Sequence, residues 1–370
     1  MAEYYVGLMS GTSMDALDAV VIDLAKAEPV LHGSLSRTFP DELRQQLLDL
    51  AQPGANEIDR SARADRQLGV FAAETVQQLL SESGIDASSV RAIGSHGQTI
   101  RHAPQANPPY TLQIGDPNTI AQLAGITTVA DFRRRDMVVG GQAAPLVPAF
   151  HEAIYRNTEH DRIALNLGGI ANITVLPADP SQAVIGFDTG PANGLMDAWC
   201  QYRRNEAFDP EGRGAASGKV NMTLLSELES DPYFAQPPPK STGREHFNLD
   251  WFLPNLPPEG LSDEDVLATL CELSARTVAA AIKEHAANSS EVIVCGGGAY
   301  NAHLLQRLKA NLPDSEIVSS ETYGIEPRWI EAMAFAWLAQ RTLQHLPGNL
   351  PSVTGAREAV ILGAIYPGKP

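Results

Sequence analysis

The chain alternates short runs of apolar, β-branched residues with longer stretches of helical periodicity. Runs of the first kind at residues 4–9 and 19–24 predict two strands joined by a turn rich in Gly, Ser and Thr. Apolar residues that recur about every 3.6 positions at 41–51 and 56–83 predict two amphipathic helices. Strands and helices mixed in this way are typical of the α/β class.

The second half of the chain repeats the opening pattern. Strands predicted at 162–167 and 171–176 flank Gly168-Gly169, as the first two strands flank the first turn. The other predicted elements are strands at 92–95, 110–114, 127–130, 184–188 and 291–295, and helices at 116–124, 263–286, 301–312 and 327–346. The repeated opening predicts two lobes of similar construction.

The length of 370 residues corresponds to about two domains at roughly 150 residues each. The predicted boundary is the segment from Gly140 to Pro145, in which flexible glycines precede a proline. We therefore expect an N-terminal lobe over 1–140 and a C-terminal lobe over 141–354, with residues 355–370 rejoining the first lobe. The proline-rich loop 236–245 is expected to be exposed.

The charge of the chain argues against nucleic acid as a partner. The sequence has 27 Lys and Arg against 44 Asp and Glu, a formal net charge of −17, whereas affinity for nucleic acid comes mainly from clustered basic side chains. The one conspicuous basic run, Arg133 to Arg135, is bracketed by Asp131 and Asp136, which indicates a ligand site or an ion-pair cluster. A small anionic ligand is compatible with this pattern.

The cysteines and the hydropathy pattern indicate a cytoplasmic protein with no membrane segment. The three cysteines include no CxxC pair and fit neither a disulfide framework nor a zinc site. The N-terminus lacks the basic and apolar regions of a signal peptide. No apolar run approaches the roughly 20 residues that span a bilayer.

The turn after the first strand is suited to binding phosphate. Its sequence is Gly7-Leu8-Met9-Ser10-Gly11-Thr12-Ser13-Met14-Asp15. Backbone N–H groups freed by glycine, with hydroxyls beside them, form a donor surface for phosphate oxygens. A carboxylate at Asp15 is placed to hold Mg²⁺, usually through water. The alternative interpretation is an ordinary hairpin turn.

Two later glycine turns predict further contacts with a nucleotide. A second phosphate cradle is predicted at Asn166, Gly168, Gly169 and Asn172. Close approach of a flat ligand, such as adenine or its ribose, is predicted at Gly296, Gly297, Gly298 and Asn301. This last turn is not the dinucleotide-binding fingerprint, because Asn301 stands where the third glycine would be.

Asp188 is predicted to lie at the end of a strand, directly before Gly190-Pro191. Asp-Thr-Gly is also the signature of aspartic proteases, but these need two such carboxylates that share a proton, and the chain has one copy. The hypotheses that stay open from the residues alone are a catalytic carboxylate and a cap for a helix after Pro191.

Polar side chains elsewhere predict contacts with a hydroxylated, acidic ligand. His96 and His102 fit a metal site poorly, because no third or fourth ligand has suitable spacing, and contacts of His96, Gln98 and Thr99 with hydroxyl groups fit better. Arg133 is suited to clamp a carboxylate through its planar fork, with surface ion pairing as the alternative. Glu331 lies on an otherwise apolar helix, where a buried acid must be paired or used.

Together these turns resemble the hexokinase, Hsp70 and actin ATPase superfamily, and within it the anhydro-N-acetylmuramic acid kinase family. The resemblance covers essentially the whole chain. It rests on six segments, at residues 7–15, 94–99, 130–136, 186–191, 240–245 and 294–299.

The resemblance implies a two-lobed actin-like ATPase fold of the α/β class, in which each lobe is a mixed β-sheet flanked by helices, with an interlobe cleft. It also implies ATP, Mg²⁺, a sugar substrate and a homodimer. Asp188 matches the catalytic base of the family, and Arg133 and Glu331 match positions of the sugar pocket. The ATP phosphate loop of the family matches Ser10, Gly11, Thr12, Ser13, Met14, Asp15, Ala16 and Leu17, with Ala16 at a position where Gly is expected.

The implied reaction converts 1,6-anhydro-N-acetylmuramic acid, ATP and water into N-acetylmuramic acid 6-phosphate and ADP, in cell-wall recycling. Because O6 of the anhydrosugar is bonded to C1, water must open the ring before O6 can accept a phosphoryl group. If Asp188 deprotonates this water, one carboxylate drives both events. The alternatives are a kinase for an ordinary sugar and an Hsp70-like ATP-driven interaction module, the latter disfavoured because no peptide-binding domain follows the last glycine turn.

Overall fold

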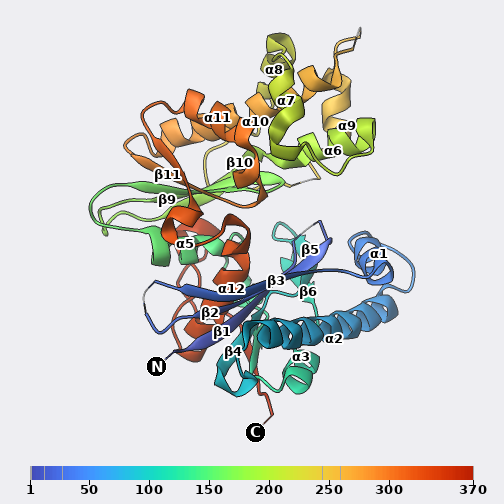
Figure 1. The fold of residues 1–370 in the computed structure, drawn as a ribbon, viewed down its shortest axis with the longest axis vertical. Coiled ribbons are helices and arrows are strands. Elements are labelled where there is room, and N and C mark those ends of the chain that lie inside the picture. The colour runs from blue at the N-terminus through green and yellow to red at the C-terminus, as the bar shows by residue number, and fades with distance from the viewer. Residues whose placement is uncertain (1, 12, 27, 244, 259, 370) are drawn as a thin grey trace. The chain divides into compact units, whose positions relative to one another are not determined.

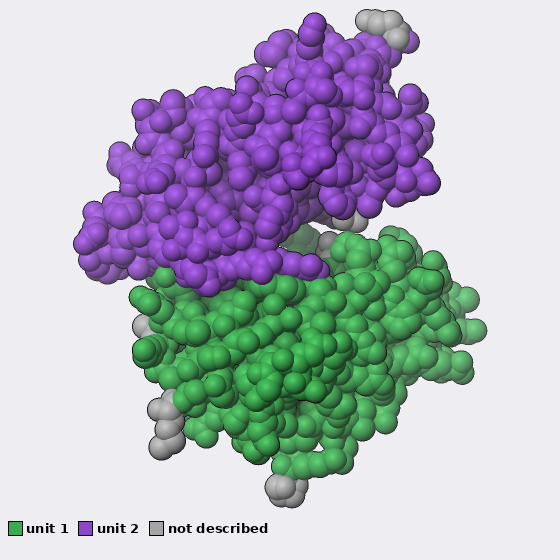
Figure 2. Space-filling model, viewed as in Figure 1, with its two compact units in different colours: residues 1–154, 329–370 green, residues 155–328 purple. Residues whose placement is uncertain are grey.

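The computed structural model describes residues 2–11, 13–26, 28–243, 245–258 and 260–369. The chain forms two compact units, coloured green and purple in Figure 2. The first comprises Met1–Ile154 and Trp329–Pro370, and the second comprises Tyr155–Arg328.

A six-stranded mixed sheet forms the centre of the first unit (Figure 1), with the strand order β13-β7-β4-β1-β2-β3. The strands are β1 (Tyr4–Met9), β2 (Ala16–Asp23), β3 (Val30–Thr38), β4 (Val90–Ser95), β7 (Thr128–Ala130) and β13 (Ala364–Tyr366). Strand β2 pairs antiparallel with both β1 and β3. Strands β4 and β7 run parallel to β1, and β13 is the edge strand and pairs antiparallel with β7.

Helices cover both faces of this sheet. Val6 and Leu8 of β1 belong to one apolar core with side chains of α2 (Glu57–Ser83). A side chain at Gly7 would collide with the backbone of α12 (Ile330–Leu343) at Ala332. Because successive residues of a strand point to opposite faces, α2 and α12 lie on opposite sides of β1.

The remaining elements of the first unit connect and flank the sheet. They are α1 (Asp41–Leu50), the hairpin of β5 (Gln98–Ala103) and β6 (Tyr110–Ile114), α3 (Pro117–Ala124), α4 (Arg134–Val138), α5 (Val147–Tyr155) and α13 (Pro351–Thr354). The side chain of Asp116 accepts a hydrogen bond from the backbone N–H of Asn118 and so caps α3.

The second unit is built on a five-stranded mixed sheet with the order β10-β9-β8-β11-β12. Its strands are β8 (Arg162–Leu167), β9 (Ile170–Leu176), β10 (Ile185–Pro191), β11 (Glu291–Cys295) and β12 (Glu316–Ser319). Its helices are α6 (Asn193–Arg204), α7 (Arg213–Ser217), α8 (Met222–Glu229), α9 (Leu249–Phe252), α10 (Asp263–His285) and α11 (Ala302–Asn311). Side chains of α6, α8 and α10 share one apolar core with those of β8, β9 and β11.

The two sheets have the same construction. In each, an antiparallel meander of three strands is followed by two strands parallel to the first, so that β3-β2-β1-β4-β7 corresponds to β10-β9-β8-β11-β12. The predicted α/β, actin-like fold with a mixed, helix-flanked sheet in each half is therefore confirmed. Within the described residues, no helix is both long and apolar enough to cross a membrane.

The structure divides the chain at other positions than residues 140 and 355. The first unit extends to Ile154 and resumes at Trp329, so that α12 belongs to it. The reason is close packing of α12 against β1 and β4, where Gly7 and Gly94 leave room for the backbone of the helix. Glu331 therefore belongs to the same unit as Arg133.

Two local expectations also need correction. β10 does not end at Asp188, because a bulge between Asp188 and Gly190 lets the strand continue to Pro191 at the edge of the sheet. The loop 236–245 is exposed in part only, since Lys240 and Thr242 contact β10.

Candidate active site

The first glycine turn is tied to the segment after β4. The hydroxyl of Ser10 donates a hydrogen bond of 2.5 Å to Oε1 of Gln98, and Nε2 of Gln98 donates to the backbone oxygen of Gly11 at 3.3 Å. Both side chains are buried. Gln98, predicted to bind the sugar, thus contacts the first glycine turn. Thr99, also predicted to bind the sugar, accepts a hydrogen bond from Gln113.

The turn itself leaves room for a ligand at Gly11, where an added Cβ would meet no atom within 4 Å. Met14 adopts the left-handed conformation with φ of 53°, whereas Ala16 is the first residue of β2 and pairs with Thr38. An alanine is compatible with this extended position, so the absence of glycine at Ala16 does not alter the turn. Thr12, predicted to bind phosphate, lies outside the described residues.

Asp15 fits a magnesium ion held mainly by phosphates and water. Its side chain is 60% exposed and accepts hydrogen bonds from Arg44 on Oδ1 alone. Among the described residues there is no cluster of three or more His, Cys, Asp and Glu side chains suited to a metal ion. Mg²⁺ does not require such a cluster, because it commonly takes one or two carboxylates together with substrate phosphates.

In the second unit, Asn193 joins the two later glycine turns. Its Nδ2 donates to the backbone oxygens of Leu167 and Gly168, and its Oδ1 accepts a hydrogen bond from Asn301. Asn301 also caps α11 through the N–H of Leu304. The turn at Gly296 packs so closely on the second turn that a Cβ there would meet Oδ1 of Asn166, while Gly297 is open.

The predicted residues of the second turn lie next to Asp188. In the register of the sheet, Asp188 is opposite Asn172, and Asn172 is opposite Asn166. Directly opposite residues of antiparallel strands point to the same face. Three polar, half-buried side chains therefore form a row across β10, β9 and β8.

Asp188 is held by the segment that follows α8. The backbone N–H of Thr242 donates to Oδ2 of Asp188 at 2.9 Å, and the hydroxyl of Tyr233 donates to its backbone oxygen at 2.7 Å. The N–H of Asp188 in turn donates to the backbone oxygen of Lys240. No hydrogen bond to Oδ1 is present within the described part of the chain, so this oxygen is available for proton transfer.

Burial raises the pKa of Asp188 to about 7. The hydrogen bond from Thr242 and the positive charge of Lys240 oppose this rise, and the negative charge of Glu245 adds to it. A carboxyl with a pKa near the working pH is suited to general-base catalysis, because it is ionised and still basic enough to take a proton.

We expect kcat/KM to increase with pH up to about 7. Asp188 must be ionised to accept a proton, and its raised pKa means that it is protonated below pH 7. The rate should fall about tenfold for each pH unit well below 7 and level off above it. A profile of kcat/KM between pH 5 and 9 tests this, and an acid limb near pH 4 would contradict it.

Arg133, His96 and Glu331 form a group in the first unit. Nε and Nη2 of Arg133 lie 3.1 and 3.0 Å from Nε2 of His96, and Nη1 donates to the backbone oxygen of Ala143. Because arginine only donates, Nε2 of His96 is the acceptor and its proton lies on Nδ1. Burial, and then the charge of Arg133, lower the pKa of His96, while burial raises the pKa of Glu331 against the charge of Arg133.

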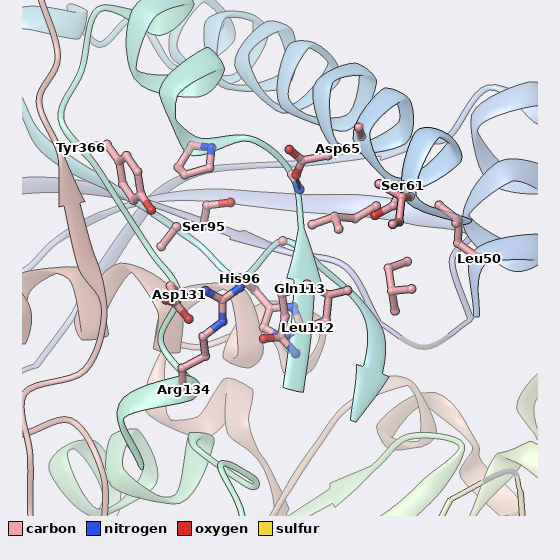
Figure 3. Close-up of a pocket in the computed structure, with 18 of the residues that line it drawn as sticks. Leu50, Ser61, Asp65, Ser95, His96, Leu112, Gln113, Asp131, Arg134 and Tyr366 are labelled. Atoms are coloured by element: carbon pink, nitrogen blue, oxygen red, sulfur yellow. Dashed lines mark hydrogen bonds and ion pairs between the residues drawn. The ribbon is translucent and has the colours of Figure 1, made fainter. Parts of the chain in front are cut away.

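A pocket of about 620 Å³ lies in the first unit (Figure 3). Its polar wall includes Ser61 and Asp65 of α2, Ser95, His96, Gln113, and the ion pair of Asp131 and Arg134. Its apolar wall includes Leu50, Ile58, Ile100 and Leu112. Of the predicted sugar-binding residues, His96 lines this pocket, whereas Gln98, Thr99, Arg133 and Glu331 do not.

Sequence reasoning missed Thr242, Tyr233 and Lys240 as the support of Asp188, and Asn193 as the link between the glycine turns. The loop with Lys240 stood out in the sequence as proline-rich, but nothing in the residue types of Lys240 or Asn193 indicates these contacts. The pocket residues Ser61 and Asp65 could have been recognised from the sequence, because they are polar residues on the core-facing side of a helix.

The duplicated sheet and its glycine turns define a protein of the actin-like α/β class. Residues 3–368 match the family model described as anhydro-N-acetylmuramic acid kinase. The chain belongs to the anhydro-N-acetylmuramic acid kinase family. The predicted resemblance and enzyme class are thereby confirmed.

Two curated relatives carry the same name. The anhydro-N-acetylmuramic acid kinase of Coxiella burnetii (strain Dugway 5J108-111) is 51% identical over 368 residues, covering 99% of this chain and 98% of the relative. That of Shewanella amazonensis is 52% identical over 364 residues and covers 98% of each chain. Among solved structures, a ROK hexokinase from Thermus thermophilus is similar at 15% identity, covering 91% of this chain and 99% of that one, with a TM-score of 0.37.

Proposed function

We propose that this kinase opens the ring of 1,6-anhydro-N-acetylmuramic acid with water and phosphorylates O6, with Asp188 as the only general base. The observation that carries this proposal is the state of the carboxylate. One oxygen accepts a hydrogen bond from the N–H of Thr242, the other accepts none from the residues that the structure describes, and the pKa is about 7. The reaction belongs to peptidoglycan recycling.

In the proposed reaction, Oδ1 of Asp188 accepts a proton from water as the water oxygen bonds to C1. The C1–O6 bond breaks and its electron pair passes to O6. O6 then attacks the γ-phosphorus, and the bond between that phosphorus and ADP breaks. One proton is left on Asp188 and is released to solvent, so atoms and charge balance.

The glycine turns are proposed to bind ATP. The first unit supplies Ser10, Gly11, Ser13 and the neighbouring N–H groups to phosphate oxygens, and the second supplies Gly168, Gly169 and Gly296 to Gly298. Asp15 would hold Mg²⁺ through its unbonded Oδ2, and the ion when bound neutralises charge on the transferring phosphoryl group.

We propose that the pocket of the first unit holds the sugar. Ligand pockets commonly have volumes of roughly 300–1,000 Å³ and combine apolar walls with a few polar groups. An N-acetylated sugar with a lactyl ether presents both kinds of surface. Arg133 does not line the pocket but contacts His96, which does. From that position it would meet the lactyl carboxylate with its remaining N–H groups, since Nη1 and Nη2 each carry two hydrogens.

The setting of the reaction is also part of the proposal. We propose a cytoplasmic homodimer, as the resemblance implies. The three cysteines, Cys200, Cys271 and Cys295, are buried and form no disulfide within the described residues, which suits a reducing compartment.

The proposed substrate predicts a preference that an ordinary sugar kinase would not have. ADP formation should be fast with 1,6-anhydro-N-acetylmuramic acid and slow with N-acetylglucosamine, whose 6-hydroxyl is already free. The assay measures kcat/KM for both sugars with Mg-ATP and identifies the product by ³¹P NMR. Equal or faster turnover of N-acetylglucosamine would favour the ordinary kinase.

A variant in the same assay tests the role of Arg133. Arg133→Lys removes the planar fork but keeps the charge, so it should lower kcat/KM for the anhydrosugar more than for the same sugar without its lactyl group. Arg135→Lys is the matched control, because Arg135 is exposed and donates to the backbone oxygen of Ile361. An equal loss with both sugars would remove Arg133 from lactyl recognition.

A further inference from the structure

Thr242 has a hydroxyl that the fold does not use. Its Oγ1 is buried and has no hydrogen-bond partner among the residues that the structure describes. A buried hydroxyl without a hydrogen-bond partner lowers the stability of the fold, because its desolvation is not compensated. Such a group is therefore expected to bind something that arrives with the substrates.

The position of Thr242 indicates which molecule its hydroxyl binds. Its backbone N–H lies 2.9 Å from Oδ2 of Asp188, and covalent geometry keeps Oγ1 within about 4 Å of that nitrogen. The unused hydroxyl therefore lies within about 7 Å of Oδ2 of the carboxylate proposed to take a proton from water. A hydroxyl donates one hydrogen bond and accepts others, as a water molecule requires.

Contacts of Lys240 and Tyr233 hold the chain that leads to Thr242. Nζ of Lys240 donates to the backbone oxygens of Tyr233 and Phe234 at 3.2 Å each and lies 4.7 Å from the ring centroid of Tyr233. The backbone oxygen of Lys240 accepts the N–H of Asp188, and Tyr233 donates to the backbone oxygen of Asp188. The segment 240–242 is thus bonded to Asp188 of β10 by the backbone of Lys240 and by that of Thr242, and presents the hydroxyl in a defined position.

We propose that Thr242 positions the attacking water through its hydroxyl while its backbone N–H orients Asp188. This inference rests on the proposed role of Asp188 as general base. The water is held by two groups, Oδ1 of Asp188 and Oγ1 of Thr242, so that its lone pair is directed at C1. Thr242 takes no proton in the step and acts by orientation alone.

Thr242→Val removes the hydroxyl and keeps the shape and the backbone N–H. It should lower kcat for the anhydrosugar by roughly 10- to 100-fold, the range for losing one hydrogen bond to a charged assembly, with KM for sugar and ATP unchanged. The acid limb of kcat/KM should stay near pH 7, because the bond to Oδ2 is retained. Thr242→Ser should keep kcat close to that of the unaltered enzyme.

Thr277→Val is the matched control, because the hydroxyl of Thr277 already donates to the backbone oxygen of Ser274 in α10. It should keep kcat. Normal kcat in Thr242→Val, or equal losses in Thr242→Val and Thr242→Ser, would overturn the proposal. If the valine variant does not fold, as judged by its Tm, Thr242→Ala replaces it, and equal kcat in the alanine and serine variants overturns the proposal.

Asp188→Asn in the same series separates this inference from the proposed function. Retained turnover in Asp188→Asn would refute the general base, and with it the role of Thr242. An inactive Asp188→Asn beside a fully active Thr242→Val would refute only the positioning role.

Discussion

Asp188→Asn is expected to lower kcat for 1,6-anhydro-N-acetylmuramic acid by about 10²- to 10⁴-fold. Asparagine keeps the size of the side chain, and its amide oxygen can still accept the hydrogen bond from Thr242, but it cannot take a proton from water. Since the same carboxylate serves ring opening and release of O6, no second base compensates for its loss. Nucleotide affinity should survive.

The measurement is steady-state turnover beside ATP affinity and Tm on one preparation. Asp179→Asn is the control, because Asp179 is an exposed residue of the same unit whose carboxylate accepts hydrogen bonds from the N–H and hydroxyl of Ser181 in a local turn. That variant should keep kcat. If Asp188→Asn keeps kcat and changes only Tm, the carboxylate is structural.

Asp15→Ala is expected to lower kcat with Mg-ATP by roughly 10²-fold or more, the size seen when one preorganised electrostatic group is removed. The alanine variant should fold normally, because the side chain is 60% exposed. It should also need more Mg²⁺ for half-maximal rate, since the carboxylate is proposed to hold the ion.

The variant Arg44→Ala distinguishes two roles of Asp15, binding of Mg²⁺ and ion pairing with Arg44. Arg44 is the partner of Asp15 in the structure, and exposed pairs contribute about 0–1 kcal/mol to stability. Arg44→Ala should therefore keep turnover and Mg²⁺ dependence. Equal losses in the two variants would indicate that the pair shapes the first turn and that Asp15 does not hold the ion.

The buried strands were the most predictable part of the fold. β11 was predicted at its observed bounds, Glu291–Cys295, because a continuous apolar run between turns has one interpretation in an α/β chain. β3 (Val30–Thr38) was not predicted, since it alternates exposed and half-buried residues and contains His, Ser and Arg. Its strand conformation depends on pairing with β2, which is a tertiary contact.

The residues of the candidate site also differ in how far the sequence predicts them. Asp188 and the glycine turns were recognisable because their residue types are informative locally. The contact between Thr242 and Asp188 spans 54 positions, and that between Ser10 and Gln98 spans 88. Such pairs follow from how strands are ordered in the sheets, and a polar loop residue carries no local sign of its partner.

The most direct test of the account is the origin of the oxygen at C1. The enzyme is incubated with Mg-ATP and 1,6-anhydro-N-acetylmuramic acid in ¹⁸O-water, and the product is analysed by mass spectrometry. A control with unlabelled N-acetylmuramic acid 6-phosphate in the same water measures how fast its C1 oxygen exchanges with solvent, and the product is analysed before that exchange occurs. The account predicts one ¹⁸O at C1 and none in the transferred phosphoryl group. Product without label at C1, or with label in the phosphate, would contradict hydrolytic ring opening coupled to phosphorylation of O6.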